Sequence, residues 1–214
     1  MKTRILQFLA SLLGCMLVLP ALADVLVFGG TRGVGLETVR QLREKGENVT
    51  VMVRSTSDLT KLNEIEGVTL VVGDAMEMDT VTAAYKSGEF DAAVSTLSGT
   101  PAAGYAVDSV GSINAIDGAK AAGVDRFILI SSIGVGDSED ALPPPVLKVL
   151  GEALAGKFEA EKHLAASGLN WTVIRPGVLT DKPVNGNGIL TEDTSAMGVV
   201  ARAEIARLTV ESIG

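Results

Sequence analysis

The sequence is poor in the residues that build metal centres and disulfide frameworks. Its 214 residues include one cysteine and one histidine. A single cysteine excludes a disulfide framework and any zinc or iron–sulfur cluster held by several thiolates. A single histidine leaves carboxylates as the remaining ligands, and we therefore expect no metal site.

The sequence also lacks an excess of positive charge. Lys and Arg total 18 against 26 Asp and Glu, which gives a net charge of −8. Nucleic-acid backbones require a basic surface, so we expect no nucleic-acid partner. Hydrophobic residues make up 47% and charged residues 21% of the chain, and this balance excludes a disordered or low-complexity protein. The length is typical of one domain.

The first residues have the pattern of a secretory signal peptide. A short basic stretch precedes the almost wholly apolar residues 5–19, and Ala21-Leu22-Ala23 follows. This order predicts cleavage before Asp24. We therefore expect a signal peptide over residues 1–23, a domain over residues 24–214 and export to the periplasm.

Three other interpretations of this leader stay open. Leu12-Leu13-Gly14-Cys15 resembles a lipobox, which would make Cys15 a lipid-anchored first residue. The apolar run is also nearly long enough to span a bilayer uncleaved. Translation from Met16 would remove the basic start and give a cytoplasmic protein. We expect membrane contact only if the leader is retained or Cys15 is lipidated.

From Asp24 onward, short apolar runs alternate with longer helical patterns. This alternation predicts parallel βαβ units in one Rossmann-like, doubly wound α/β domain. The expected strands are residues 25–28, 48–53, 68–72, 91–95, 126–130 and 170–174. The expected helices are residues 34–45, 58–64, 78–87, 106–122, 146–167 and 201–213. Because the strands are apolar almost throughout, we expect helices to cover both faces of the sheet and Trp171 to be a core residue.

A glycine-rich loop joins the first expected strand to the first expected helix. Gly29 permits a tight turn, Gly33 lets a pyrophosphate approach the backbone, and Gly35 allows close packing of helix on strand. The helix N-terminus offers free N–H groups and a positive dipole end to phosphates. The strand before and the helix after make this loop a dinucleotide-binding motif. Its expected cofactor contacts are Gly29, Thr31, Arg32, Gly33, Val34 and Gly35.

The end of the second expected strand bears on the choice of dinucleotide. Proteins that bind NAD(H) usually carry an acidic residue here, which holds the ribose 2′-hydroxyl. This strand ends instead in Arg54-Ser55. A guanidinium suits a 2′-phosphate, and Arg32 in the loop offers a second one. The two arginines favour NADP(H) as the cofactor over NAD(H).

With these features the chain resembles the atypical short-chain dehydrogenase/reductases of the NmrA-like, NAD(P)H-binding type, and especially small members of the flavin reductase/biliverdin-IXβ reductase group. The resemblance covers residues 24–213. Besides the glycine loop, it rests on residues 72–75 (VGDA), 121–127 (AAGVDRF), 130–134 (ISSIG), 157–161 (KFEAE) and 167–177 (SGLNWTVIRPG).

The resemblance implies roles on the adenosine side and along the middle of the cofactor. Asp74 and the backbone of Ala75 would contact the adenine ring. Thr96, Leu97 and Ser98, after the fourth expected strand, would line the ribose on the nicotinamide side. These positions follow the carboxyl ends of expected strands, where ligands of doubly wound sheets bind.

The resemblance also implies an active site, with one departure from the family's pattern. Ser132 falls where the family places its active-site serine, and Pro176 would cover the carboxamide. Lys157 takes the place of the lysine of the Y-x-x-x-K motif, which holds the nicotinamide ribose. The tyrosine of that motif is replaced by Ala153, so no phenol stands there to donate a proton.

Two functions from different classes follow. The first is an NAD(P)H-dependent oxidoreductase that transfers hydride to a small-molecule substrate, of which a flavin- or quinone-like acceptor is one kind. Such a reaction mainly requires that two ring systems be oriented. The second is a non-catalytic NADP(H)-binding sensor or assembly factor of the NmrA-like type, which the missing tyrosine favours.

Overall fold

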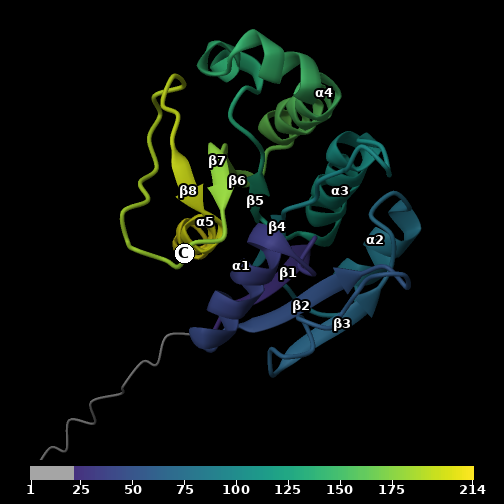
Figure 1. The fold of residues 1–214 in the computed structure, drawn as a ribbon. Coiled ribbons are helices and arrows are strands. Elements are labelled where there is room, and N and C mark those ends of the chain that lie inside the picture. Colours follow the sequence, from purple (N-terminus) through teal and green to yellow (C-terminus); the bar gives the residue numbers. More distant parts are fainter. Residues whose placement is uncertain (1–21) are drawn as a thin grey trace, which may run out of the picture.

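A computed structural model describes residues 22–214 (Figure 1). The signal-peptide, lipobox and Met16 predictions fall on residues 1–23, of which 1–21 lie outside the described part. The described chain forms one α/β domain around a six-stranded sheet. The prediction of a single Rossmann-like domain is thus confirmed for the described residues.

The six strands of the main sheet are all parallel and have the order β3-β2-β1-β4-β5-β6. They are β1 (Asp24–Phe28), β2 (Asn48–Val53), β3 (Val68–Val72), β4 (Ala92–Ser95), β5 (Arg126–Ile130) and β6 (Asn170–Ile174). The strand order reverses between β1 and β4. This reversal opens a crevice beyond the carboxyl ends of these strands, as in other doubly wound sheets.

Helices cover both faces of the sheet. They are α1 (Gly33–Glu44), α2 (Met78–Tyr85), α3 (Ser112–Ala122), α4 (Pro144–Ala166) and α5 (Arg202–Glu211). Figure 1 shows α1 and α5 on one side of the strands and α2, α3 and α4 on the other. A π-helical turn, Val107–Gly111, leads into α3, and a 3-10 turn, Gly136–Ala141, precedes α4.

Alternation along β1 divides the hydrophobic core into two layers. Val25 and Val27 pack with α1 and α5, whereas Leu26 and Phe28 pack with α2 and α3. All four side chains are almost fully buried. A strand buried on both sides reads as a continuous apolar run, which is why the central strands could be predicted from the sequence.

The predicted helix over residues 58–64 is wrong. Asp58 begins a local turn, because its carboxylate accepts hydrogen bonds from the backbone N–H (3.0 Å) and the hydroxyl (2.7 Å) of Thr60. Such short-range bonds compete with helix formation. Isolated turns follow, and Leu62 and Ile65 reach the core from them. The apolar spacing indicated burial correctly but not a continuous helix.

The prediction that every strand is covered on both faces is wrong at the two edges of the sheet. Val72 of β3 is 67% exposed, and Trp171 of β6 is 43% exposed rather than a core residue. Edge strands have a neighbour on one side only, so their side chains lose the cover that central strands receive. Phe127 of the central strand β5, by contrast, is fully buried.

A second, two-stranded parallel sheet was not predicted. It consists of β7 (Val178–Thr180) and β8 (Val199–Ala201). Residues 181–198, which we call the strap, connect these two strands. It loops away from the body of the molecule before it returns to β8 (Figure 1).

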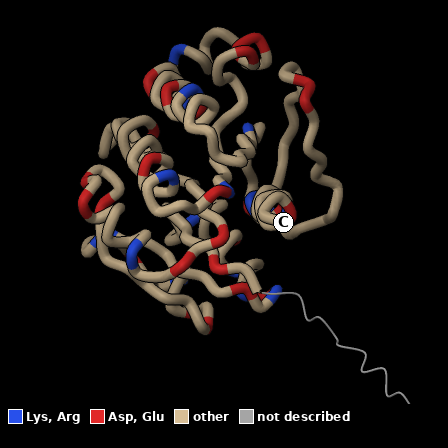
Figure 2. Tube along the Cα trace, turned by 180° about the vertical axis from the view of Figure 1, so that it is seen from behind, with Lys and Arg blue, Asp and Glu red and all other residues tan. Residues whose placement is uncertain are grey.

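Acidic side chains outnumber basic ones and are spread over the helices and loops of the far side (Figure 2). Among residues 22–214, no helix is both long and apolar enough to cross a bilayer.

Candidate functional site

The glycine loop turns sharply from β1 into α1. Gly29 and Gly33 have φ values of 87° and 58°, in the left-handed region that glycine adopts without strain. Thr31 is half-buried between them, and Arg32, the residue that precedes α1, is exposed. Val34 is buried in the first turn of the helix.

The N-terminus of α1 is suited to an anion. No side chain caps it, and its first turn holds no acidic residue. The free N–H groups and the positive end of the helix dipole therefore remain available for a phosphate.

The loop is locked onto β4 by very close contacts. Thr96 donates its hydroxyl toward the carbonyl oxygens of Phe28 (3.2 Å) and Gly29 (3.1 Å). A Cβ on Gly35 would lie 2.3 Å from the carbonyl oxygen of Gly29 and 2.4 Å from Oγ1 of Thr96. Gly35 is thus the point where α1 can approach the loop and the strand, as its place in the motif indicates.

The residues predicted for the adenosine side lie on separate turns. Arg54 and Ser55 are exposed after β2. Asp74 accepts a hydrogen bond from the backbone N–H of Met76 at 3.0 Å, so it also makes a local turn. Ala75 is buried, and its carbonyl oxygen accepts a 2.9 Å bond from the side chain of Asn114. Neither Arg54 nor Arg32 has a side-chain hydrogen bond or ion pair within the described chain.

Lys157 is fixed by a carboxylate that sequence reasoning missed. Its Nζ lies 2.9 Å from Oδ1 of Asp108 and 3.3 Å from the carbonyl oxygen of Leu97. The side chain of Asp108 has no exposed surface, and its Oδ2 accepts a 2.8 Å bond from the N–H of Gly99. Lys157, the π-helical turn and the chain after β4 are therefore held together. No local pattern distinguishes Asp108, because Ser109, Ser112 and Asp117 are polar residues of the same segment.

The predicted serines differ in their surroundings. Ser132 is half-buried and donates its hydroxyl to the carbonyl oxygen of Ile133 at 2.9 Å. Ser98 is exposed. At the carboxyl ends of β4 and β5, the hydroxyls of Ser95 and Ser131 are buried without a hydrogen-bond partner in the described chain. Unsatisfied buried hydroxyls are uncommon, and they mark this edge of the sheet as a place for a polar ligand.

Pro176 closes the site from the β6 side. Its carbonyl oxygen accepts a 2.9 Å hydrogen bond from the N–H of Ile133, which ties the turn after β5 to the turn after β6. A Cβ on Gly177 would lie 2.2 Å from the carbonyl oxygen of Gly198, so the strap returns directly against this turn.

Arg175 joins three elements next to Pro176. Its guanidinium binds both carboxylate oxygens of Glu161, at 3.1 and 2.7 Å, and also contacts Asp137. The hydrogen bonds that Arg175 donates to Glu161 raise the pKa of the guanidinium above its already high value, and the one that it donates to Asp137 lowers the pKa of that carboxyl. This ion-pair cluster fixes α4 and the 3-10 turn against the end of β6. Glu161 and Arg175 belong to motifs that carry the family resemblance, but the sequence does not predict that they meet.

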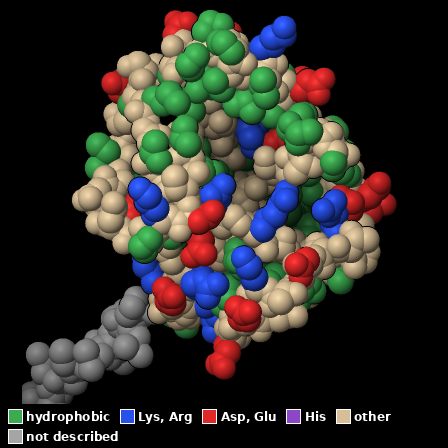
Figure 3. Space-filling model, in the orientation of Figure 1, with side chains coloured by type: hydrophobic (Ala, Val, Ile, Leu, Met, Phe, Trp, Pro, Cys, Tyr) green, Lys and Arg blue, Asp and Glu red, His purple; other side chains and the backbone are tan. Residues whose placement is uncertain are grey.

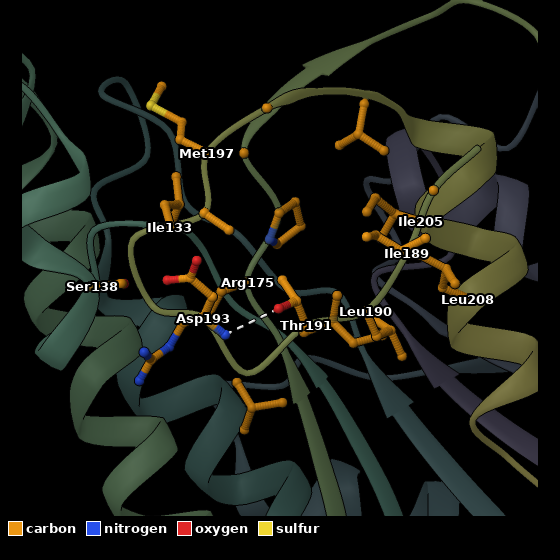
Figure 4. A pocket seen from close by; sticks show the side chains of 18 of the residues that line it. Ile133, Ser138, Arg175, Ile189, Leu190, Thr191, Asp193, Met197, Ile205 and Leu208 are labelled. Atoms are coloured by element: carbon orange, nitrogen blue, oxygen red, sulfur yellow. Dashed lines mark hydrogen bonds between the residues drawn. The ribbon is translucent and has the colours of Figure 1, made fainter.

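A cavity of about 1110 Å³ lies between β6, α4, α5 and the strap. Figure 4 shows Ile205 and Leu208 of α5 facing Ile189 and Leu190 of the strap, with Ile133 and Arg175 farther along the cavity. One end is lined by Ile133 and Pro176, so the cavity adjoins the edge of the sheet described above. In Figure 3 a hollow opens on this side of the molecule, and Lys and Arg side chains gather along its lower rim.

The two tyrosines do not replace the missing phenol. Tyr85 is buried on α2 and donates its hydroxyl to the carbonyl oxygen of Ala115 at 2.7 Å. Tyr105 is half-buried before the π-helical turn, and its hydroxyl makes no hydrogen bond within the described chain. Ala153 is on α4, one turn before Lys157.

Residues 29–214 match the family of NAD(P)H-binding proteins, so the match covers nearly the whole described chain. The chain belongs to the NAD(P)H-binding family. This match confirms the family resemblance that the sequence motifs indicated. It also confirms that the cofactor class is NAD(P)H.

Members of this family and their structural neighbours differ in what they do. ChuY, an anaerobilin reductase from Escherichia coli O157:H7, has the same fold with a TM-score of 0.78 and 32% identity, over 88% of this chain and 89% of its own. A chloroplastic protein of Arabidopsis thaliana is 30% identical over 88% of this chain and 71% of its own. The photosystem II assembly factor Ycf39 of Cyanophora paradoxa is 27% identical over 89% of this chain and 59% of its own.

Proposed function

We propose that this NAD(P)H-binding protein is a reductase that delivers a hydride to a small planar acceptor. The observation that carries the proposal is the meeting of three features at the carboxyl edge of one parallel sheet. They are the glycine loop, the uncapped N-terminus of α1 and Lys157 held by the buried carboxylate of Asp108. Dinucleotides bind at this edge in doubly wound sheets. The likeness to ChuY, a reductase, supports the same conclusion.

The residues at this edge fit a dinucleotide. The free N–H groups of α1 and the loop glycines would hold the pyrophosphate. Asp74 and Ala75 would border the adenine, and Thr96, Leu97 and Ser98 would border the second ribose. A bound dinucleotide supplies the hydride from its nicotinamide ring.

The chain itself contributes orientation and protection from water. We assign Lys157 to the ribose hydroxyls, to which its remaining N–H groups can donate, and Pro176 to the cover over the carboxamide. Ser132 would face the reacting ring. Because Ala153 offers no phenol, the proton that balances the hydride on the acceptor would come from solvent. Positioning of the two rings is then the main source of rate acceleration.

NADPH is the proposed reductant. Arg54 and Arg32 are exposed, and neither is engaged by an acid in the described chain. Both guanidinia are therefore available for a 2′-phosphate, which Arg binds in a bidentate manner. No acidic residue follows β2 directly to hold a 2′-hydroxyl.

The proposed acceptors are flavins, quinones and bilins. The cavity beside the nicotinamide edge has apolar side chains such as Ile133 and Leu190 together with charged ones such as Arg175. This mixed lining suits a flat conjugated molecule that carries polar substituents. The bilin class is added because ChuY is an anaerobilin reductase.

The test is a panel assay with purified protein and NADPH. We expect the nicotinamide absorbance to fall when at least one flavin, quinone or bilin is added, with one reduced acceptor formed per NADPH consumed. The assay is run without oxygen, because dioxygen re-oxidises reduced flavins and quinones. Loss of absorbance without an equal amount of reduced acceptor would then contradict the proposal.

A second candidate is a non-catalytic, NADP(H)-binding assembly factor. The observation that favours it is Ala153 in place of the motif tyrosine, and the likeness to the assembly factor Ycf39 agrees with it. Tight NADPH binding with no acceptor reduced in the panel would support this function over the first.

We also propose that residues 1–23 are a targeting segment removed before Asp24, leaving residues 24–214 as the mature domain. Asp24 begins β1, and its backbone N–H donates a 2.9 Å hydrogen bond to the carboxylate of Asp91. A new, positively charged amino terminus at Asp24 would therefore lie beside the negative carboxylate of Asp91. N-terminal sequencing of the exported protein tests this: a first residue other than Asp24 would contradict it.

A further inference from the structure

Arg202 approaches the glycine loop from a part of the chain that the dinucleotide motif does not include. It is the first residue of α5. A Cβ on Gly33 would lie 3.8 Å from both Cδ and Nε of Arg202, so the arginine stem lies against the loop. Gly33 is the glycine expected to let a pyrophosphate approach the backbone.

The position of Arg202 is fixed by the packing of α5 on α1. Ile205 and Leu208 of α5 share a hydrophobic core with Leu36 and Val39 of α1. Gln41 of α1 donates a 2.7 Å hydrogen bond to the carbonyl oxygen of Ala203. The first turn of α5 therefore lies against α1, and the side chain of Arg202 reaches from it to Gly33 at the start of α1.

The present partner of Arg202 is weakly held. Its Nη1 lies 2.8 Å from Oδ1 of Asp181, at the start of the strap. The Asp181 side chain is 88% exposed and that of Arg202 is 31% exposed. Ion pairs of this kind contribute little stability, because water screens them and ordering the side chains costs entropy. The pyrophosphate of a dinucleotide carries two negative charges and four non-bridging oxygens, so it would compete well for the same guanidinium.

Basic side chains also outnumber acidic ones around Arg202. A cavity of about 350 Å³ beside Gly33 is lined by Lys61, Lys182 and Arg202, against the acids Glu37 and Asp181. The whole chain, by contrast, carries 26 acids and 18 bases. Cations from three distant segments thus meet next to the uncapped N-terminus of α1.

We propose that Arg202 binds the pyrophosphate of the dinucleotide and that Asp181 competes with the phosphate for it. This proposal rests on the proposed function, because it requires a dinucleotide at the glycine loop. The two arginines would then bind different groups of the cofactor. Arg54 would bind the 2′-phosphate, which NADH lacks, whereas Arg202 would bind the pyrophosphate, which NADPH and NADH share.

The competition predicts opposite effects for the two partners of one ion pair. Arg202→Ala removes the phosphate ligand and should weaken binding of NADPH and of NADH alike, by about tenfold or more. Asp181→Asn removes the competitor and should tighten both by about two- to fivefold. A clamp that only fastens the strap to α5 would be broken equally by either substitution, so both variants would then shift binding in the same direction.

The experiment measures dissociation constants for NADPH and NADH by nicotinamide fluorescence, and for adenosine 2′-monophosphate by competition. Adenosine 2′-monophosphate lacks the pyrophosphate, so Arg202→Ala should leave its affinity unchanged. Arg40→Ala is the matched control, because Arg40 pairs only loosely, at 3.8 Å, with Glu37 farther along α1 and loses the same charge. Arg202→Gln keeps most of the stem over Gly33 if the alanine variant does not fold.

Opposite shifts for Arg202→Ala and Asp181→Asn, with no shift for Arg40→Ala, would support the assignment. Shifts in the same direction, or unchanged affinity in Arg202→Ala and Arg202→Gln, would overturn it while leaving the proposed function in place. Failure of the wild-type protein to bind either dinucleotide would overturn both.

Discussion

Lys157 places its ammonium 2.9 Å from Oδ1 of Asp108, a carboxylate with no exposed surface. The side chain of Lys157 is itself only 12% exposed. Burying one charge without the other would cost several kcal/mol, so the two residues depend on each other. The pair also fixes the lysine beside Leu97, in the region assigned to the nicotinamide ribose.

Lys157→Met is expected to destabilise the protein strongly. Removing the ammonium leaves Asp108 buried and unpaired, which should lower the free energy of unfolding by about 3–5 kcal/mol. Chemical denaturation monitored by circular dichroism measures this change.

The double variant Asp108→Asn/Lys157→Met separates stability from binding. It removes both charges, so most of the lost stability should return, yet dinucleotide binding should stay weak because the ammonium is still absent. Recovery of wild-type affinity in the double variant would show that Lys157 does not contact the cofactor.

Gly35→Ala should damage both the fold and the cofactor site. The new methyl group would lie 2.3 Å from the carbonyl oxygen of Gly29, and neither backbone segment can move without breaking contacts to Thr96. We expect a loss of about 1–3 kcal/mol in stability and a loss of NADPH affinity.

Gly151→Ala is the control for this substitution. Gly151 lies within α4, and a Cβ there would meet no atom within 4 Å. The same change should therefore stabilise the protein by about 0.5–1 kcal/mol, because alanine favours a helix over glycine. Equal effects at the two positions would contradict the close approach at Gly35.

Arg54→Ala tests the proposed preference for NADPH. Loss of the guanidinium should weaken NADPH binding by about tenfold or more while changing NADH binding little, because only NADPH carries the 2′-phosphate. Fluorescence titration with both dinucleotides measures the ratio. An equal loss for the two cofactors would rule out contact between Arg54 and the 2′-phosphate.

Tyr85 predicts a decline of stability in alkali. Burial raises the pKa of its phenol well above 10, so the folded state holds the proton more tightly than the unfolded chain does. The resulting stability is fully present below about pH 10, the pKa of an unfolded tyrosine, and is lost as the pH rises through and beyond it.

Tyr85→Phe should remove this pH dependence. At neutral pH it should cost about 1 kcal/mol for the lost bond to Ala115, and the difference from wild type should shrink above about pH 10. Urea denaturation across this range measures it. Parallel curves for the two proteins would mean that the phenol ionises as readily in the fold as in the unfolded chain.

Much of the fold could be predicted because, in the central strands, the apolar runs of the sequence correspond to side chains that are buried in the structure. After their first residues, Asp24 and Arg126, β1 and β5 are apolar because both of their faces are covered. Gly46 and Gly123 follow the ends of α1 and α3 and have the positive φ values that glycine favours after a helix. Apolar spacing failed to predict the structure where a side chain competes with the backbone for hydrogen bonds. At Asp58, the carboxylate binds the N–H of Thr60, and turns stand in place of the predicted helix.

The parts of the site that the sequence did not predict depend on contacts between distant segments. Asp108 and Lys157 are 49 positions apart and meet only because the π-helical turn packs against α4. Arg202 meets Gly33 through the packing of α5 on α1. No spacing rule connects such pairs. Residues within one loop, such as Gly29 and Gly35, are predictable because the motif itself fixes their geometry.

Hydride transfer itself is tested most directly by a single turnover. The protein, in excess over NADPH so that all of the cofactor is bound, is mixed with the flavin, quinone or bilin acceptors, and the nicotinamide absorbance is followed. In the absence of oxygen, hydride transfer should give a first-order decay whose rate rises with acceptor concentration and then saturates, with an equal amount of reduced acceptor formed. Stable absorbance in bound NADPH with every acceptor would contradict it.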